Sequence, residues 1–93
     1  MYYDKQGKEI TQEEWGRLLE SPEYKIVNQD KLGGYIVSTV WLGLNHNFSG
    51  GDALIFETMV FDTAGNDLEM ERYHTLEEAE KGHKEMINKF KKK

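Results

Sequence analysis

Three histidines are the side chains in this sequence best suited to acid–base chemistry or metal binding. His46 stands in an Asn-His-Asn segment between two strand-like stretches, where an imidazole on a loop could contact a ligand or act as a general base. The alternative for His46 is a role in closing the loop by hydrogen bonds. His74 and His83 are nine residues apart, which is not the i, i+4 spacing of two metal ligands on one helix. The sequence therefore predicts no metal site.

A carboxylate interrupts a segment that is otherwise suited to burial. Glu57 lies within Leu54–Phe61, and a buried carboxylate is costly unless it is paired. Arg72 in the next strand-like segment is a candidate partner, and His83 is another. A pair of this kind could bind a polar ligand or shift a proton. The alternative is an exposed glutamate or a structural ion pair.

His83 follows a glycine on the apolar side of the last predicted helix. A glycine inside a helix costs about 1 kcal/mol relative to alanine, so Gly82 indicates that another element packs closely against it. The simpler interpretation of His83 is a hydrogen-bonded core histidine that holds the helix on a sheet.

Several kinds of reaction lack the residues they require. The chain contains no cysteine, which excludes disulfides, thiolate metal sites and cysteine nucleophiles. The glycine pairs Gly33-Gly34 and Gly50-Gly51 match neither the phosphate-binding loop nor the dinucleotide fingerprint. No Ser–His–acid arrangement can be assigned. We therefore expect a protein that is not an enzyme and that needs no cofactor.

The net charge of −5 is unevenly distributed along the chain. Residues 1–80 carry 6 basic and 16 acidic groups, a net of −10, whereas residues 81–93 carry six lysines and one glutamate, a net of +5. The acidic part disfavours direct binding to nucleic acid and suits a partner protein with a basic surface. The terminal lysines, Lys93 included, suit the negative end of a helix dipole. The predicted acidic face consists of Asp67, Glu69, Glu71, Glu77, Glu78 and Glu80.

These side chains must be positioned by a small number of elements, because 93 residues form one domain. Residues 1–10 read as an arm or a short hairpin, and Thr11 with Glu14 has the capping-box spacing of a helix start. That helix is predicted over residues 11–21 and ends at Pro22. Thr75 with Glu78 predicts a second helix over residues 75–91.

Strand-like segments fill the stretch between the two helices. They lie at residues 24–28, 35–44, 53–61 and 67–73, with turns or loops at 29–34, 45–52 and 63–66. The second and third segments are apolar on both faces, which is typical of central strands. No crossover helix separates any two strands, so an antiparallel meander is the simplest topology. The prediction is an α+β fold, with a four-stranded antiparallel sheet over residues 24–73 and both helices packed on one face.

No stretch of the chain approaches the ~18 consecutive apolar residues of a membrane-spanning helix. The first ten residues also lack the apolar core of a secretory signal. We therefore expect no membrane association and a cytoplasmic location.

The segments Ser38–His46, Leu54–Phe61, Arg72–Thr75 and Gly82-His83 together resemble a group of small uncharacterised proteins from bacteriophages and prophages. The group shares a core of the form S-T-V-x-L-G-L-D-H, L-I-F-E-T-M-V-F, R-Y-x-T and G-H. The match covers roughly residues 36–86. Asn45 stands where many of the similar proteins have aspartate, which weakens any role that needs a carboxylate beside His46.

The resemblance implies a phage-borne accessory protein of the kind that inhibits a host defence protein, such as a CRISPR effector, in the bacterial cytoplasm. The first expectation is therefore an acidic binding protein that docks on a basic surface of a host protein. The alternative is a small-ligand or nucleotide-binding domain that uses a His/Glu/Arg cluster beside the sheet. A homo-oligomer is left open. The expected partner-binding or ligand-binding residues are Trp41, His46, Glu57, Thr58, Arg72, Tyr73 and His83.

Overall fold

The computed structural model describes residues 1–47 and 49–92, so Lys93 of the lysine-rich end lies outside the described residues. Within them, no helix is both long enough and apolar enough to cross a membrane. The elements follow in the order β1 (Tyr2–Tyr3), β2 (Glu9–Ile10), α1 (Gln12–Leu19), α2 (Pro22–Lys25), β3 (Ile26–Leu32), β4 (Tyr35–Trp41), β5 (Phe56–Asp62), β6 (Asp67–Tyr73) and α3 (Leu76–Lys91).

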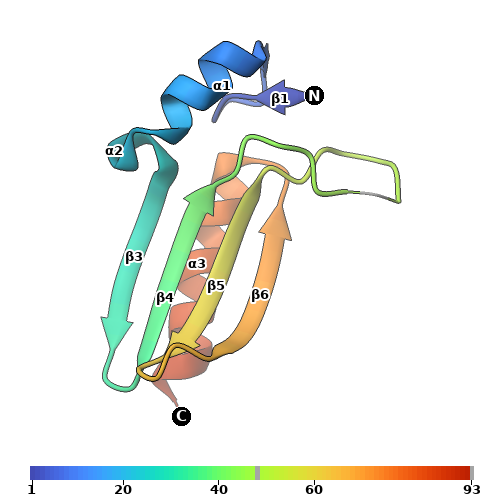
Figure 1. The fold of residues 1–93 in the computed structure, drawn as a ribbon. Helices are drawn as coiled ribbons and strands as arrows, with labels where there is room; N and C mark the ends of the chain where they lie inside the picture. Colours follow the sequence, from blue (N-terminus) through green and yellow to red (C-terminus); the bar gives the residue numbers. More distant parts are fainter. Residues whose placement is uncertain (48, 93) are drawn as a thin grey trace.

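Strands β3 to β6 form one antiparallel sheet in the order β3-β4-β5-β6, with α3 behind it (Figure 1). This confirms the predicted α+β meander. The turn between β5 and β6 is built by Asp62, whose Oδ1 accepts the backbone N–H groups of Ala64 and Asn66 at 3.0 and 2.9 Å. The Asn66 side chain also donates to Asp62, and these bonds hold the pKa of the Asp62 carboxyl below its usual value.

The sheet has an inner face, which α3 covers, and an outer face on the opposite side. Alternate residues of β4 and β5 are buried on the inner face, as the two-residue period of a strand requires. Helix α3 packs across all four strands, and Thr75 and Glu78 form the predicted capping box at its start. The buried residues of α3 are Ala79, Gly82, His83, Met86 and Phe90.

Two apolar clusters lie between α3 and the sheet, and a polar layer separates them. One cluster, towards the C-terminal end of α3, consists of Val37, Val60, Met86 and Phe90. The other, towards the start of α3, consists of Trp41, Ile55, Phe56 and Ala79. Between the two clusters the buried residues are polar, namely Thr39, Thr58 and His83. The core is therefore interrupted at its middle by side chains that need hydrogen-bond partners.

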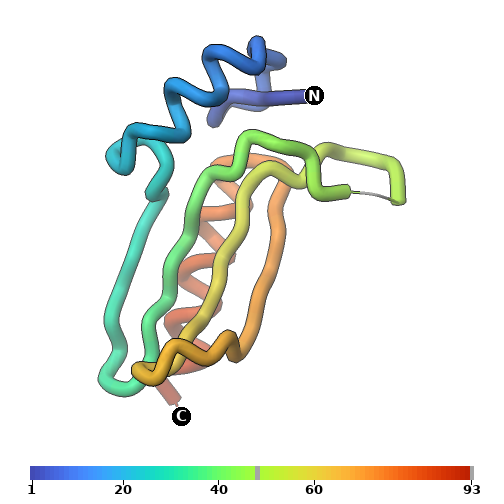
Figure 2. The backbone as a smooth tube through the Cα atoms, viewed as in Figure 1, coloured from blue at the N-terminus to red at the C-terminus, as the bar shows by residue number. Residues whose placement is uncertain are grey.

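The N-terminal elements close one end of this core. Helix α1 lies with β1 and β2 beyond the ends of β4 and β5, whereas α3 runs along the inner face (Figures 1 and 2). The prediction that both helices pack on one face of the sheet therefore holds for α3 and is wrong for α1, which packs mainly on α2 and β1. Two indoles fasten this end, because Trp15 Nε1 donates to the Leu42 carbonyl at 2.9 Å and Trp41 Nε1 donates to the Tyr3 carbonyl at 3.0 Å. Thr11 caps α1 as predicted, by accepting from the Glu14 N–H.

The structure differs from the sequence prediction around the first strand. Pro22 follows α1 and is also the first residue of the one-turn helix α2. The Ser21 side chain caps α2 by accepting the N–H of Tyr24. Strand β3 then runs over Ile26–Leu32 and takes up most of the predicted 29–34 turn, which shrinks to Gly33 and Gly34. The polar residues of β3 are tolerated because it is an edge strand with an exposed side.

Candidate functional site

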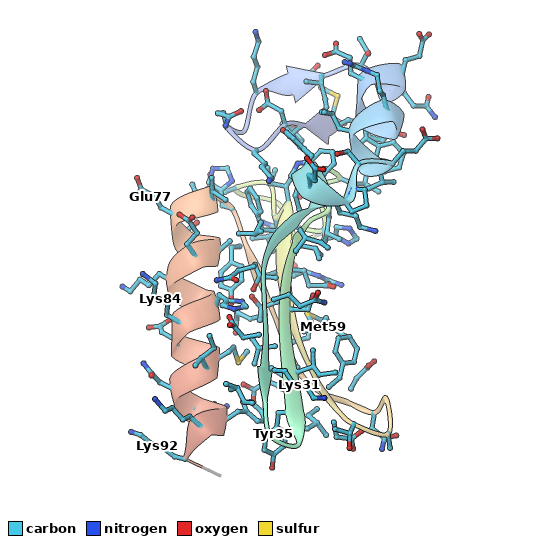
Figure 3. The ribbon with its side chains drawn as sticks, turned by 90° about the vertical axis from the view of Figure 1, so that its left-hand side faces the viewer. Lys31, Tyr35, Met59, Glu77, Lys84 and Lys92 are labelled. Atoms are coloured by element: carbon cyan, nitrogen blue, oxygen red, sulfur yellow. The ribbon has the colours of Figure 1, made fainter. Side chains whose placement is uncertain are left out.

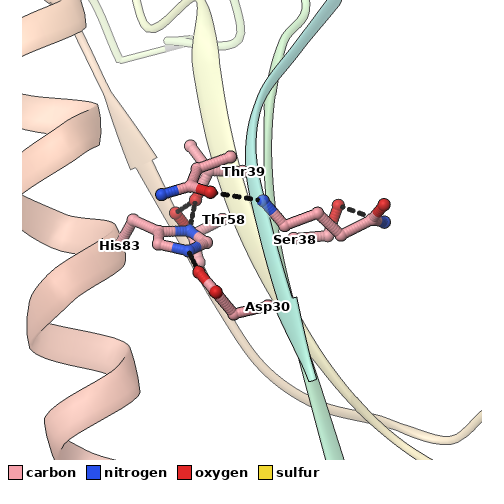
Figure 4. A network of polar contacts seen from close by, with 7 residues as sticks. Asp30, Ser38, Thr39, Thr58 and His83 are labelled. Carbon is pink, nitrogen blue, oxygen red and sulfur yellow. Dashed lines mark hydrogen bonds and ion pairs between the residues drawn. The ribbon is translucent and has the colours of Figure 1, made fainter. Parts of the chain in front are cut away.

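The polar layer under α3 is a chain of four side chains from four elements. His83 on α3 is 1% exposed, and its Nε2 lies 2.7 Å from Oδ2 of Asp30 on β3. Its other ring nitrogen, Nδ1, lies 2.6 Å from Oγ1 of Thr39 on β4. Thr39 Oγ1 is in turn 2.5 Å from Oγ1 of Thr58 on β5. Figure 4 shows these contacts between the helix and the strands.

The donor of each hydrogen bond in this polar layer follows from which groups carry a hydrogen to donate. A carboxylate only accepts, so His83 Nε2–H donates to Asp30. In the neutral ring Nδ1 is then an acceptor, and the Thr39 hydroxyl donates to it. The lone pairs of Thr39 are left to accept the hydroxyl of Thr58. Each member of the layer therefore has a partner, which is what buried polar groups require.

A hydroxyl beside an imidazole that is held by a carboxylate is also the arrangement that activates a nucleophile. Here the hydroxyl is out of reach of any substrate, because Thr39 and Thr58 are both 0% exposed. The arrangement instead connects α3 to β3, β4 and β5 by hydrogen bonds. The interpretation of His83 as a hydrogen-bonded core histidine is confirmed.

Tyr73 on β6 extends this layer towards the edge of the sheet. Its ring lies directly against the backbone of Gly82, where a Cβ atom would overlap the phenol ring. The close packing predicted from Gly82 is therefore confirmed. The Tyr73 Oη is buried without a hydrogen-bond partner among the described residues. Burial raises the pKa of Tyr73, and the charges of Glu71 and Glu85 add to the rise. The nearby Thr58 hydroxyl opposes it.

The Glu57–Arg72 pair lies on the outer face. The two residues are direct cross-strand partners on β5 and β6, and Arg72 Nε donates to Glu57 Oε2 at 3.0 Å. Their side chains are 31% exposed for Arg72 and 16% for Glu57. The pairing with Arg72 is thus confirmed, and the alternative pairing of Glu57 with His83 is wrong because the sheet separates the two side chains.

His46 lies in the long loop between β4 and β5. Its backbone N–H donates to the Leu54 carbonyl at 3.0 Å. The preceding Asn45 organises the loop, since its Oδ1 accepts the N–H groups of Asn47 and Leu54 at 2.8 and 3.1 Å. An aspartate at position 45 would accept the same two bonds. The third histidine, His74, places Nδ1 2.7 Å from the Ala53 carbonyl.

The structure distributes the residues selected from the sequence over three places. Trp41, Thr58, Tyr73 and His83 lie on the inner side, Glu57 and Arg72 lie on the outer face, and His46 lies in the loop. A ligand site that joins His46, Glu57, Arg72 and His83 is therefore not formed. Among residues 1–47 and 49–92, no group of three or more His, Asp or Glu side chains is arranged to hold a metal ion.

The acidic residues are divided as well. Glu69 and Glu71 on β6 line a groove of about 360 Å³ together with Glu85 of α3, and we call this the acidic groove. Its one lysine, Lys89, donates to both oxygens of Glu69 at 2.5 and 2.7 Å. The remaining acidic residues of α3, Glu77, Glu78 and Glu80, line another hollow with Lys81 and Lys84.

Sequence reasoning missed Glu85 as a member of the acidic groove. The signal was present, because Gly82, Glu85, Met86 and Lys89 recur at the three- and four-residue spacing of one helical face, and all four line the groove. It was hidden by the position of Glu85 among the lysines of the basic C-terminal end.

The chain matches no protein-family model, no curated protein and no solved structure. The contacts and charges described above are therefore the basis on which a function is proposed.

Proposed function

We propose that this chain is a small acidic binding protein that docks on a basic surface of another protein through the acidic groove. The observation that carries the proposal is the concentration of Glu69, Glu71 and Glu85 along one groove that contains a single lysine. That lysine is already paired with Glu69, so the charges of Glu71 and Glu85 remain for a partner.

The position of the groove supports docking of an extended segment. Strand β6 is the last strand in the sheet order, and among the described residues no further strand pairs with its outer edge. The backbone groups of an edge strand can pair with an extended segment of another chain. Lysine or arginine side chains of such a segment would meet Glu71 and Glu85, both of which are exposed.

The charge of the whole chain favours the same kind of partner. The net charge of −5 repels nucleic acid and accelerates association with a basic protein. Binding of this kind weakens as salt rises, because the screening length falls from about 10 Å at 0.1 M to about 3 Å at 1 M ionic strength.

The proposed partner is a host defence protein such as a CRISPR effector, encountered in the bacterial cytoplasm. This part of the proposal rests on the resemblance of residues 36–86 to phage and prophage proteins. The proposed action is inhibition by occupancy of a basic surface, and it requires no catalytic group from this chain.

The test reverses the charge of the groove and compares it with an equal change elsewhere. Glu71→Lys/Glu85→Lys is expected to weaken binding to a partner captured from host lysate by at least about tenfold in Kd, and to remove most of its salt dependence. The matched control is Glu13→Lys/Glu23→Lys, which makes the same charge change at exposed positions of α1 and α2. Equal loss in both variants would show that the groove is not the docking site.

A further inference from the structure

The outer face of the sheet is covered by no element among the described residues. Figure 3 shows α3 on one side of the sheet and Met59 on the other, with no second layer beyond it. The strand register arranges the outer side chains in three rows across the sheet. The rows are Lys31–Ile36–Phe61–Asp67, Gln29–Ser38–Met59–Met70 and Ile26–Val40–Glu57–Arg72.

Half of these twelve side chains are apolar, namely Ile26, Ile36, Val40, Met59, Phe61 and Met70, and some of them are well exposed. Ile26 is 39% and Met70 is 44% exposed, and Leu68, at the irregular step of register in β6, is 42% exposed. Between these edges lie Met59 and Phe61 on β5, with Ser38 and Ile36 opposite them on β4. Exposed apolar side chains gathered on one face of a sheet are a feature of surfaces that another molecule covers.

The polar residues of this face that already have a partner would tolerate burial. Arg72 already donates to Glu57 at 3.0 Å, and Gln29 Nε2 donates to Ser38 Oγ at 3.3 Å. A buried ion pair whose partners remain together avoids the large cost of a lone buried charge. In these three rows the charged residues without a partner on the same face are at the two edges, Lys31 on β3 and Asp67 on β6.

We propose that a second copy of this chain packs its outer face on this one, in a two-fold dimer. With the axis parallel to the strands and between β4 and β5, β3 of each copy faces β6 of the other. Lys31 and Asp67 belong to the same row, so each Lys31 then meets Asp67 of the second copy, and each Ile36 meets Phe61. This row is therefore complementary to itself in charge and in apolar surface. In the other two rows the apolar residues meet polar or charged side chains, and these contacts are Met59 on Ser38, Met70 on Gln29, Val40 on Glu57 and Ile26 on Arg72.

The size of the face sets the strength of the dimer. Four strands of seven residues, at about 4.8 Å between strands and 3.3 Å per residue, cover roughly 450 Å² of sheet plane in each copy. Two such faces pack about 10 Å apart, as in other sheet-on-sheet contacts. The area lies at the low end of specific interfaces, so the dimer forms at micromolar or higher concentration.

This inference is independent of the proposed function. The acidic groove opens between β6 and α3, on the inner side of the sheet, and it remains accessible when the outer faces are joined. A dimer would carry two grooves and so strengthen binding to a partner with two basic sites.

The experiment measures the weight-average mass by sedimentation equilibrium from about 1 to 500 μM, a range centred on the affinity expected for so small an interface. We expect the mass to rise from the 10.9 kDa of the single chain towards twice this value. Lys31→Glu and Asp67→Lys should each raise the dimer Kd about tenfold, since each places like charges together at both edges. An equimolar mixture of the two variants should recover the wild-type mass, because every edge contact then joins opposite charges.

The controls are Lys84→Glu and Asp52→Lys, which make the same charge changes away from the outer face and should leave the mass curve unchanged. Met59→Asp should abolish the dimer, and circular dichroism checks that each variant is folded. The proposal is overturned by a constant monomer mass over the whole range or by a dimer that Met59→Asp leaves intact. It is also overturned if the mixture of Lys31→Glu and Asp67→Lys has no higher weight-average mass than either variant alone.

Discussion

Tyr73 lies directly against Gly82, so the absence of a side chain at position 82 determines how closely α3 approaches the sheet. The sequence predicts close packing at Gly82, because glycine is unfavourable within a helix, but it does not identify the residue that packs there. The neighbour is on β6, nine residues earlier in the chain but on a different element. Only the crossing of α3 over the sheet brings the two residues together.

Gly82→Ala is expected to destabilise the protein by about 1–3 kcal/mol, because the added Cβ overlaps the Tyr73 ring and forces the helix away. The matched control is Gly16→Ala in α1, where nothing lies within 4 Å of the added Cβ. That change should stabilise the protein by up to about 1 kcal/mol through helix propensity. Urea unfolding of the two variants measures the difference, and equal effects would contradict the packing role of Gly82.

At the scale of elements, Gly43 joins the N-terminal segment to the end of the sheet. Its φ is +70°, and a Cβ there would overlap the side chains of Trp41 and Trp15. The Gly43 carbonyl also accepts the N–H of Tyr3 at 2.8 Å. The indole of Trp15 on α1 and the indole of Trp41 at the end of β4 therefore pack around a residue that must be glycine.

Gly43→Ala is expected to cost more stability than Gly65→Ala, although both glycines have a positive φ. Gly65, with φ of +88°, has nothing within 4 Å of a new Cβ, so its substitution adds only backbone strain of about 1 kcal/mol. At Gly43 the overlap with two indoles adds to that strain and should loosen α1. Hydrogen exchange in α1 and tryptophan fluorescence would detect this, and equal behaviour of the two variants would contradict it.

The elements themselves were largely predictable from local sequence. Thr11 and Thr75 mark the helix starts, and the segments 35–44 and 53–61, apolar on both faces, contain the central strands Tyr35–Trp41 and Phe56–Asp62 almost completely. The first strand was misplaced because β3 is polar on much of its length, and Asp30 reads as a turn residue. Its carboxylate is used by His83, 53 residues later, and no local pattern contains that contact.

At the scale of the whole molecule, the stability should fall in alkali because two tyrosines are partly withdrawn from water. Burial raises the pKa of both Tyr73 and Tyr24 above the ordinary tyrosine value of 10.0. A group whose pKa is higher in the folded chain contributes stability that is complete below the unfolded pKa. That contribution is lost as the pH rises through the folded pKa.

Tyr73→Phe should therefore reduce the loss of unfolding free energy above pH 10, and it removes an unpartnered hydroxyl from the interior. At pH 7 the variant should be as stable as the wild type or slightly more stable. Urea unfolding between pH 7 and 11.5, with tyrosinate absorbance followed in parallel, checks both expectations. If the free energy of unfolding of Tyr73→Phe falls as steeply above pH 10 as that of the wild type, Tyr73 is not the cause of the alkaline destabilisation.

The sequence by itself determined the class of fold, the antiparallel order of the strands and the start of each long helix, because caps, turns and residue alternation act over a few positions. It also contained the cross-strand pair of Glu57 and Arg72, which adjacent strands bring together. Only the tertiary structure decided which candidate residues share a face. It buried His83 in a polar layer, moved the Glu57–Arg72 pair to the opposite side, and left the outer face uncovered. The physical reason is that one helix covers one side of a four-stranded sheet, and local sequence does not specify which side.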